Sequence, residues 1–239
     1  MKLSDKTLTI LKNFAGINTG IFFQTGKVIK TVAPTKSILA TANIDEEFPT
    51  DFGIYDMTRL LGAYSLFDGK QELSYDKETF VTISEGKRKI DYKTCNPELL
   101  IRPPEGKDIQ LPSEDVHVVL TSGDMDFTIR QANVLSLTEI AFTGDRENVY
   151  ISALDAKNPD QTSTSTTIGE TNAEFQFTFK IENLSKLMLK DYNVTISSKG
   201  LSKFSSQDGS IEYFVAVEAT SSHFNAWLWK NLFYGSKSI

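Results

Sequence analysis

The chain has 239 residues, of which 40% are hydrophobic and 23% charged, and its formal net charge is −6. This length and composition exclude a disordered, collagenous or membrane-spanning chain and fit one large domain or two domains of about 110 residues. The single cysteine, Cys95, excludes an intrachain disulfide framework, and one cysteine with two histidines leaves little material for a transition-metal site. The net negative charge by itself argues against DNA binding, because phosphate contacts require lysine and arginine.

The first half of the chain begins with a predicted helix over residues 4–14, because Ser4 is a favourable N-cap and apolar residues recur after it at helical spacing. A second helix is predicted to begin at Asp56 and to bury Leu60 and Leu61. The strands predicted in this half lie at residues 17–23, 51–55, 71–75 and 80–84. Alternation of apolar and polar residues gives such strands one buried and one exposed face.

The same order returns after Gly123, which indicates a loose internal repeat. A third helix is expected to begin at Asp124 or Asp126 and to end near Leu135. The elements predicted after it are strands at 139–142, 148–154 and 175–179, a helix from Glu182 that carries Leu184, Leu187 and Met188, and strands at 193–198 and 212–219. The two halves are therefore predicted to be related units dominated by sheet, with two short helices each.

The predicted domains are residues 1–96 and 113–224. Residues 97–112 between them are rich in proline, which removes backbone donors, so they are expected to form an extended connector. Residues 158–172 are rich in threonine and serine without apolar periodicity and are predicted to be an exposed loop. Residues 225–239 form a hydrophobic C-terminal tail.

The sequence shows few signs of catalysis. The segment after Gly123 lacks the lysine and the spacing of a phosphate-binding loop. His117 and His223 have no acid or nucleophile at motif spacing, and no base is identifiable for Cys95. The acidic run 45–47 could bind a divalent cation, although such a run is usually only solvated. An enzyme is therefore the least favoured class of function.

The cations of the four predicted helices are more informative than the net charge. At about 100° per residue, they fall on the faces opposite the apolar side chains. These cations are Lys6, Lys12, Arg59, Arg130, Lys186 and Lys190. Most acids of the helices lie at the helix starts, where they cap N–H groups and complement the helix dipole. Solvation alone explains any one of these cations, but four helices with the same cationic face predict a common basic surface for a polyanion.

Several short segments follow one another in the order found in a known family: MKLS at residues 1–4, LKNFAGINTGI at 11–21, ANI at 42–44, IYD at 54–56 and YFVAVEA at 213–219. Together they resemble the T4-type bacteriophage sliding clamps. The resemblance covers residues 1–224, and it is dense over residues 1–70 and sparse over residues 75–210. It rests on the order of these matches and on the internal repeat, since clamps have no catalytic motif.

The resemblance implies an α+β DNA clamp fold, with two similar domains per chain, antiparallel sheets outside and two helices per domain inside, closed into a ring-shaped homotrimer. Such a ring encircles duplex DNA without reading its sequence and tethers the replicative polymerase to confer processivity. It also contacts late-transcription factors and is loaded by an ATP-driven clamp loader. It has no catalytic activity or cofactor, does not engage a membrane, and acts in the cytoplasm of the infected bacterial host.

The same resemblance assigns expected roles to the helix cations. The residues expected to line the hole are Lys6, Lys12, Arg130, Lys186 and Lys190, with Arg59 as a weaker choice. The chain departs from the family at Asn133, where a second cation of the third helix is expected. A hole that slides along DNA holds phosphates through water and screened charge, so the loss of one cation is tolerable.

A second departure lies at the C-terminus, because a clamp of this family should end near Phe224. The extra segment contains both tryptophans of the protein and is too short to span a bilayer. It resembles the short hydrophobic C-terminal peptides with which polymerases of this system bind the clamp. The expected partner-binding tail comprises Trp227, Trp229, Leu232 and Phe233. The last two are expected to occupy the partner pocket of this subunit or its neighbour; alternatively the tail packs on its own sheet edge or is a fused peptide.

A DNA polymerase processivity clamp is thus the leading prediction. The alternative is a structural or interaction protein of the virion that does not encircle DNA. The cationic helix faces and the N-terminal match favour the clamp.

Overall fold

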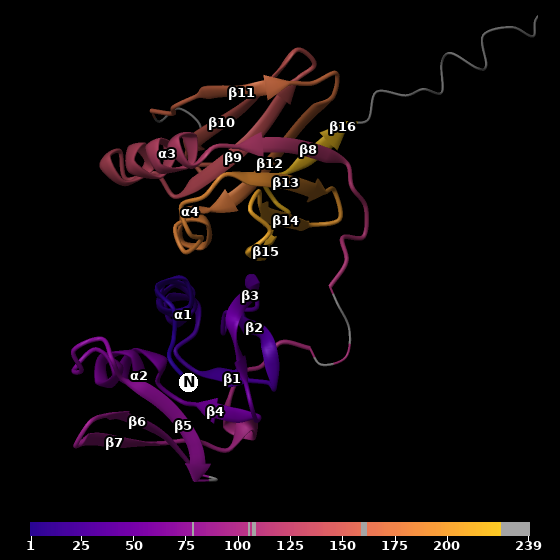
Figure 1. The fold of residues 1–239 in the computed structure, drawn as a ribbon. Helices are drawn as coiled ribbons and strands as arrows, with labels where there is room; N and C mark the ends of the chain where they lie inside the picture. The colour runs from indigo at the N-terminus through magenta and orange to yellow at the C-terminus, as the bar shows by residue number, and fades with distance from the viewer. Residues whose placement is uncertain (78, 105, 107–108, 159–161, 226–239) are drawn as a thin grey trace, which may run out of the picture. The chain divides into compact units, whose positions relative to one another are not determined.

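The computed structural model describes residues 1–77, 79–104, 106, 109–158 and 162–225 (Figure 1). The chain divides into two compact units. Unit 1 consists of Met1–Gln110, Lys186–Met188 and Lys203–Val215, and unit 2 of Leu111–Ser185, Leu189–Ser202 and the chain from Ala216 onward. No helix among the described residues is both long and apolar enough to cross a membrane.

Unit 1 has two helices, each with a side-chain cap. They are α1 (Asp5–Ile17) and α2 (Met57–Tyr64), and a 3₁₀ turn, η1 (Pro97–Leu99), follows later in the chain. The sequence predicts both starts correctly, since Ser4 Oγ accepts the N–H of Thr7 and Asp56 Oδ1 accepts the N–H of Arg59. The first helix runs three residues beyond Phe14, because Ile17 continues its apolar face and is buried, so the predicted strand over residues 17–23 begins only at Ile21.

The strands of unit 1 form parts of two sheets. They are β1 (Ile21–Phe23), β2 (Gly26–Val32), β3 (Ile38–Phe48), β4 (Phe52–Ile54), β5 (Glu72–Lys77), β6 (Phe80–Glu85), β7 (Arg88–Lys93), β14 (Leu201–Ser206), which begins in unit 2, and β15 (Ile211–Ala216). The strand order is β4-β1-β2-β3-β15-β14 in one sheet and β5-β6-β7 in the other. Antiparallel pairing sets Tyr213 of β15 opposite Ala40 of β3. A strand from the second repeat therefore completes a sheet of the first unit, so the units do not follow chain order.

An aromatic cluster fills part of the core of unit 1. The rings of Phe23 and Phe52 are stacked with centroids 4.6 Å apart, and Phe48 meets Phe23 edge-on at 4.8 Å. Tyr75 lies 5.2 Å from Phe52, and burial raises the pKa of its phenol. These rings join β1, β3, β4 and β5, so they hold the two sheets of this unit together.

A partly buried chain of hydrogen bonds ties α1 to the segment that follows α4. Asn13 Nδ2 donates to the carbonyl of Lys186 at 2.8 Å, and the hydroxyl of Tyr213 donates to Asn13 Oδ1 at 2.7 Å. The N–H of Met188 in turn donates to that hydroxyl at 3.2 Å. Asn13 therefore links α1 to two other segments of unit 1.

Unit 2 repeats the pattern of a long helix, strands and a short helix. Its elements are β8 (Val116–Leu120), α3 (Ser122–Val134), β9 (Glu139–Asp145), β10 (Asn148–Leu154), β11 (Thr166–Glu170), β12 (Glu174–Lys180), α4 (Ile181–Leu184), β13 (Tyr192–Ser197) and β16 (His223–Asn225). One sheet has the order β11-β10-β9-β12-β16, and β8 pairs antiparallel with β13. The bounds of β10 are those that the sequence predicts.

Three predictions for this unit are wrong, and the first two concern the third helix and the predicted loop. The third helix begins at Ser122 and not at Asp124 or Asp126, because Thr121 Oγ1 caps it by accepting the N–H of Asp124 at 3.1 Å. Residues 158–172 do not form only a loop, since β11 lies within them. Its threonines, which obscured the apolar pattern, suit a half-exposed strand at a sheet edge.

The fourth helix is also much shorter than predicted. It ends at Leu184, so Lys186 and Lys190 follow the helix and do not share a helical face. Its N-cap residue, Lys180, makes no side-chain cap bond. The carbonyl of Lys186 and the N–H of Met188 bond to Asn13 and Tyr213, which replaces the helical pattern.

Tyr213→Phe tests this buried link. It leaves the Met188 N–H and Asn13 Oδ1 without their hydroxyl partner in a fully buried position. We expect the free energy of unfolding to fall by about 1–3 kcal/mol, measured by urea denaturation at one protein concentration. Tyr55→Phe is the control, since Tyr55 is 66% exposed and its substitution should leave the midpoint unchanged. A Tyr213→Phe midpoint equal to that of the wild type would contradict the assignment.

Candidate functional site

Three of the predicted cations of unit 1, Lys6, Lys12 and Arg59, lie on two helices that contact each other, α1 and α2. Lys6 and Arg59 have side chains 48% and 82% exposed, and Lys12 is exposed as well. Lys6 Nζ lies 3.2 Å from Asp45 Oδ1, and Arg59 Nε lies 3.1 Å from Asp56 Oδ2. Exposed ion pairs of this kind contribute only about 0–1 kcal/mol. A phosphate can therefore replace either carboxylate at little cost.

The acidic run 45–47 is part of the support of α1. Glu46 accepts hydrogen bonds from the Ser4 N–H and the Thr7 hydroxyl at the start of the helix. Burial raises the pKa of Glu46, but these hydrogen bonds outweigh burial and hold it below its ordinary value. Asp45 pairs with Lys6, and among the described residues no group of three or more His, Cys, Asp or Glu could hold a metal ion. Two of the three acids therefore orient α1 and its cation.

Unit 2 places its predicted cations differently. Arg130 lies on α3 with a side chain 67% exposed, and its Nε is 2.9 Å from Asp126 Oδ2 one turn earlier. Asp126 therefore pairs with a cation inside the helix and caps nothing. Lys190 is half-buried in the segment after α4, whereas Lys186 belongs to unit 1. Asn133, where the family leads us to expect a cation, is exposed on α3.

The groups considered for catalysis have ordinary structural surroundings. Cys95 forms a bridge with Gly53 beside β4, and burial raises the pKa of its thiol, which disfavours the nucleophilic thiolate. His117 Nδ1 lies 3.3 Å from the hydroxyl of Thr195 on the paired strand. The predicted tail residues, Trp227, Trp229, Leu232 and Phe233, lie outside the residues that the structure describes.

Unit 1 also contains a groove that the sequence did not predict. Its volume is about 250 Å³, and its walls come from β2, β3, β15 and the connector. The apolar side chains that line it include Val28, Leu39, Pro103, Ile109 and Phe214. Four separate segments form the groove, so no local motif marks it. One usable signal is Val28, an apolar residue 41% exposed in the middle of a strand.

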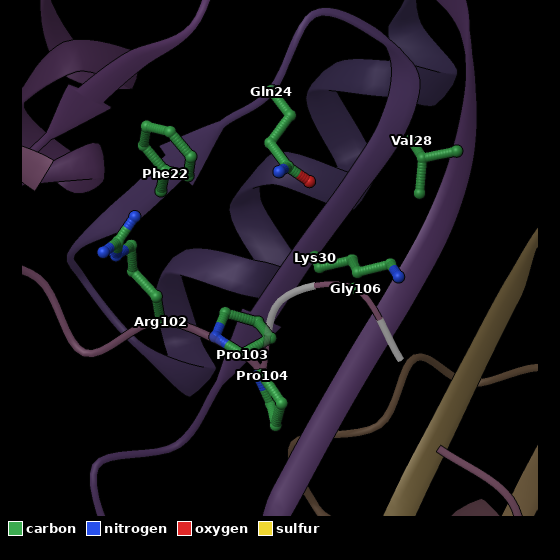
Figure 2. A pocket seen from close by; sticks show the side chains of 8 residues that line it. All are labelled: Phe22, Gln24, Val28, Lys30, Arg102, Pro103, Pro104 and Gly106. Carbon is green, nitrogen blue, oxygen red and sulfur yellow. The ribbon is translucent and has the colours of Figure 1, made fainter. Parts of the chain in front are cut away.

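A smaller hollow of about 50 Å³ adjoins this groove, and its lining includes two cations and one amide among apolar residues. It shares Val28, Lys30, Pro103 and Pro104 with the groove. It adds Phe22, Gln24, Arg102 and Gly106, and Figure 2 shows Arg102 beside Phe22 with Gln24 and Lys30 on the other side. The guanidinium carbon of Arg102 lies 5.2 Å from the centre of the Phe22 ring.

Comparison with known families matches both halves of the chain. The model of the DNA polymerase processivity factor matches residues 2–101, and that of the gp45 sliding clamp, C terminal, matches residues 118–219. The sliding clamp of Vibrio phage KVP40 is 32% identical over 231 residues, which cover 92% of this chain and 100% of the relative. The sliding clamps of Enterobacteria phage T4 and Escherichia phage RB69 are each 29% identical, with 93% of this chain and 99% of theirs covered.

Solved structures show the same fold at lower identity. A structure described as the C-terminal region of FEN-1 bound to A. fulgidus PCNA matches with a TM-score of 0.65 and 18% identity, covering 91% of this chain and 96% of that one. PCNA from Thermococcus kodakaraensis matches with a TM-score of 0.64 and 16% identity, covering 89% and 96%. At these identities the likeness shows the fold alone.

Glu46→Gln tests the support of α1. The folded-state pKa of Glu46 lies below its ordinary value of 4.5, so the stability from its charge is full above that pH and is lost as the pH falls through the folded value. We expect a loss of about 1 kcal/mol in the free energy of unfolding at pH 7, and convergence with the wild type as the pH falls through the lowered folded-state pKa of Glu46. Urea titrations from pH 3 to pH 7 measure this, with the exposed neighbour substitution Glu47→Gln as control. A difference in the free energy of unfolding between the wild type and Glu46→Gln that stays constant at every pH would contradict this role of the Glu46 charge.

Proposed function

Because the chain belongs to the family of phage sliding clamps, the DNA polymerase processivity factors, we propose that it closes with two further copies into a ring that encircles duplex DNA and tethers the replicative polymerase. The observation that carries the proposal is the match of both halves to clamp domains, over residues 2–101 and 118–219. The ring acts without catalysis in the cytoplasm of the infected bacterial host. An ATP-driven loader places it on DNA, and late-transcription factors use it as well.

The helix cations support contact with the DNA backbone. Lys6, Lys12 and Arg59 on unit 1 and Arg130 on unit 2 are exposed side chains of helices, and three of these four have a nearby acid as partner. Such cations attract phosphate by screened charge and release it easily, which suits a protein that must slide. Base contacts would instead fix its position.

The internal repeat supports a specific join between copies. In unit 1, β15 of the second repeat pairs with β3 of the first. By position in the repeat, β7 corresponds to β15 and β11 corresponds to β3. We therefore propose that β7 of one copy pairs with β11 of the next, which repeats the pairing found within the chain and continues head to tail.

Two other sheet edges of the described residues are covered. Met1 exchanges hydrogen bonds with Leu73 of β5, and Cys95 bridges Gly53 of β4. The outer sides of β7 and β11, like those of β8 and β16, have no strand partner within the described part of their sheets, and the repeat singles out the first two. An open sheet edge presents unpaired N–H and C=O groups that can pair with another chain. In the proposed ring, β7 and β11 use these groups to pair with each other between copies.

The apolar groove of unit 1 supports peptide binding. A structural neighbour, PCNA of A. fulgidus, holds the C-terminal region of FEN-1. We propose that the groove lined by Val28, Leu39, Ile109 and Phe214 receives a short segment of the polymerase in the same manner. Burying about 100 Å² of apolar surface there contributes about 2.5 kcal/mol to binding. Such a contact is weak by itself, but a ring that stays on the DNA keeps the polymerase close enough to rebind.

Replacing three helix cations tests the DNA surface. We expect Lys12→Gln, Arg59→Gln and Arg130→Gln combined to shorten retention of the loaded ring on nicked circular DNA. Affinity for duplex DNA should fall less steeply with salt, with a slope of log K against log salt lower by up to about 2.7 for three phosphate contacts.

The control triple variant removes three exposed lysines from loops and turns: Lys36→Gln, Lys87→Gln and Lys157→Gln. It changes the net charge by the same amount as the helix variant. It therefore distinguishes the effect of a local cationic surface from the effect of the overall charge of the protein. Equal retention and equal salt slopes for the two triple variants would contradict the helix assignment.

Proline substitution tests the proposed join. Adjacent residues in the regular part of a strand direct their N–H groups to opposite sides, so Thr166→Pro and Thr167→Pro each remove one N–H, and one of them spares the ladder to β10. We expect the variant that spares the ladder to β10 to keep the circular dichroism spectrum of the wild type. Its assembly should dissociate at a protein concentration at least about tenfold higher than that of the wild type, which corresponds to a loss of about 1.4 kcal/mol per join. Native mass spectrometry and sedimentation velocity measure the oligomer. A wild type that is monomeric throughout, or two trimeric variants, would refute the join.

A further inference from the structure

The two strand edges of the proposed join carry opposite charges at the ends that would meet. Arg88 and Lys89 begin β7, and Glu170 ends β11. We propose that Glu170 of one copy forms an ion pair with Arg88 or Lys89 of the next copy, and that this pair strengthens the join and makes it sensitive to salt. The inference rests on the proposed ring and adds the side chains by which one copy recognises another.

The pairing inside the chain predicts which ends of the two strands meet. β15 and β3 run antiparallel, with Ile211, the first residue of β15, opposite Ala42, the fifth residue of β3. β7 and β15 are both six residues long, and β11 has the length of the five-residue part of β3 that pairs with β15. Transferred by position, this register sets Arg88, the first residue of β7, opposite Glu170, the fifth residue of β11.

The bulge in β11 adds a second cation to the residues that can face Glu170. Val149 of β10 pairs with Gly169 and Tyr150 pairs with Thr167, so Ile168 is one extra residue in β11. A shift of one residue in the proposed join sets Lys89 opposite Glu170 in place of Arg88. Both are cations, so Glu170 meets a positive charge in either register.

The cations at the start of β7 are exposed and only weakly paired. Arg88 Nη1 lies 3.3 Å from Asp68 Oδ2, and the two side chains are 68% and 82% exposed. Lys89 Nζ lies 3.4 Å from Asp91 Oδ1, whereas Lys77 Nζ lies closer to the same carboxylate, 2.5 Å from Oδ2. Exposed ion pairs of this kind contribute little to stability. A carboxylate of a neighbouring copy can therefore replace Asp68 or Asp91 at low cost.

The end of β11 carries the complementary charge. Glu170 is exposed, and the N–H of the next residue, Thr171, donates to the carbonyl of Glu147 at 3.0 Å. Glu147 is exposed as well, so two carboxylates lie at this end of the strand. Arg146, in the turn beside them, pairs with Glu174 of β12. Acids therefore outnumber cations where β11 ends, which is the charge that attracts the start of β7.

The same charges disfavour a join between two β7 edges. The cations of β7 are Arg88, Lys89 and Lys93, and its one acid is Asp91. Antiparallel pairing of two β7 strands would bring Lys93 of one copy toward Arg88 of the other, and like charges on facing strands repel. β11 has one acid, Glu170, and no cation. The charges thus favour β7 with β11, the head-to-tail contact that a closed ring of identical copies requires.

Charge reversal in the full chain tests the pair, with sedimentation velocity at low and high salt as the measurement. We expect Glu170→Lys to raise the protein concentration at which the assembly dissociates by about tenfold at low salt, because an attraction becomes a repulsion. The difference from the wild type should shrink at high salt. The substitution also makes the net charge of each copy less negative, which by itself would reduce repulsion between copies, so a weaker assembly reports the local contact.

A second charge reversal tests which cations face Glu170. At low salt, either Arg88→Glu or Lys89→Glu should restore assembly when it is combined with Glu170→Lys in the same chain. Glu47→Lys is the control, because Glu47 is an exposed residue of β3 outside both strands and its reversal changes the net charge equally. It should leave the dissociation unchanged. Circular dichroism checks that each variant is folded.

The outcomes separate the ion pair from the join. A wild type that is monomeric at every concentration refutes the join, and the ion pair with it. If the wild type assembles and Glu170→Lys dissociates at the same concentration at low salt, the ion pair is refuted and the join stands. If Glu170→Lys weakens assembly but neither double variant restores it, the start of β7 is not the partner of Glu170.

Discussion

The pairing of β15 with β3 is the constraint on which the rest of unit 1 depends. It brings a strand of the second repeat into the sheet of the first, and with it the hydroxyl of Tyr213 that reaches Asn13 on α1. The same strand carries Phe214, which walls the apolar groove. One backbone register thus links the cationic helix α1 to the sheet and builds the groove, and its repetition is the basis of the proposed join between copies.

Local signals predicted the parts of the fold that local interactions determine. Ser4 and Asp56 mark helix starts because each cap acts within three residues. The length of α4 could not be predicted, since the groups that end its helical pattern bond to Asn13 and Tyr213, distant in sequence. The strand β11 was not predicted because its threonines do not alternate with apolar residues. The groove was not predicted because four separate segments form it.

The net charge of −6 is a sum over the whole chain and does not show where the charges lie. Asp45, Asp56 and Asp126 each lie beside a cation of a helix, so the acids that lower the total also hold Lys6, Arg59 and Arg130 in place. The sequence identified these cations from their helical faces. It also placed Lys186 and Lys190 on such a face, which the short α4 does not provide.

The repeat has a consequence for how the proposed ring parts. Two kinds of strand join alternate around it: β3 with β15 inside each chain, and β7 with β11 between chains. The first kind cannot separate far, because the same polypeptide runs through both partners, whereas the second kind has no covalent link. In the proposed ring, only the β7–β11 joins between chains can therefore open fully. A DNA duplex would enter the ring through one of these joins.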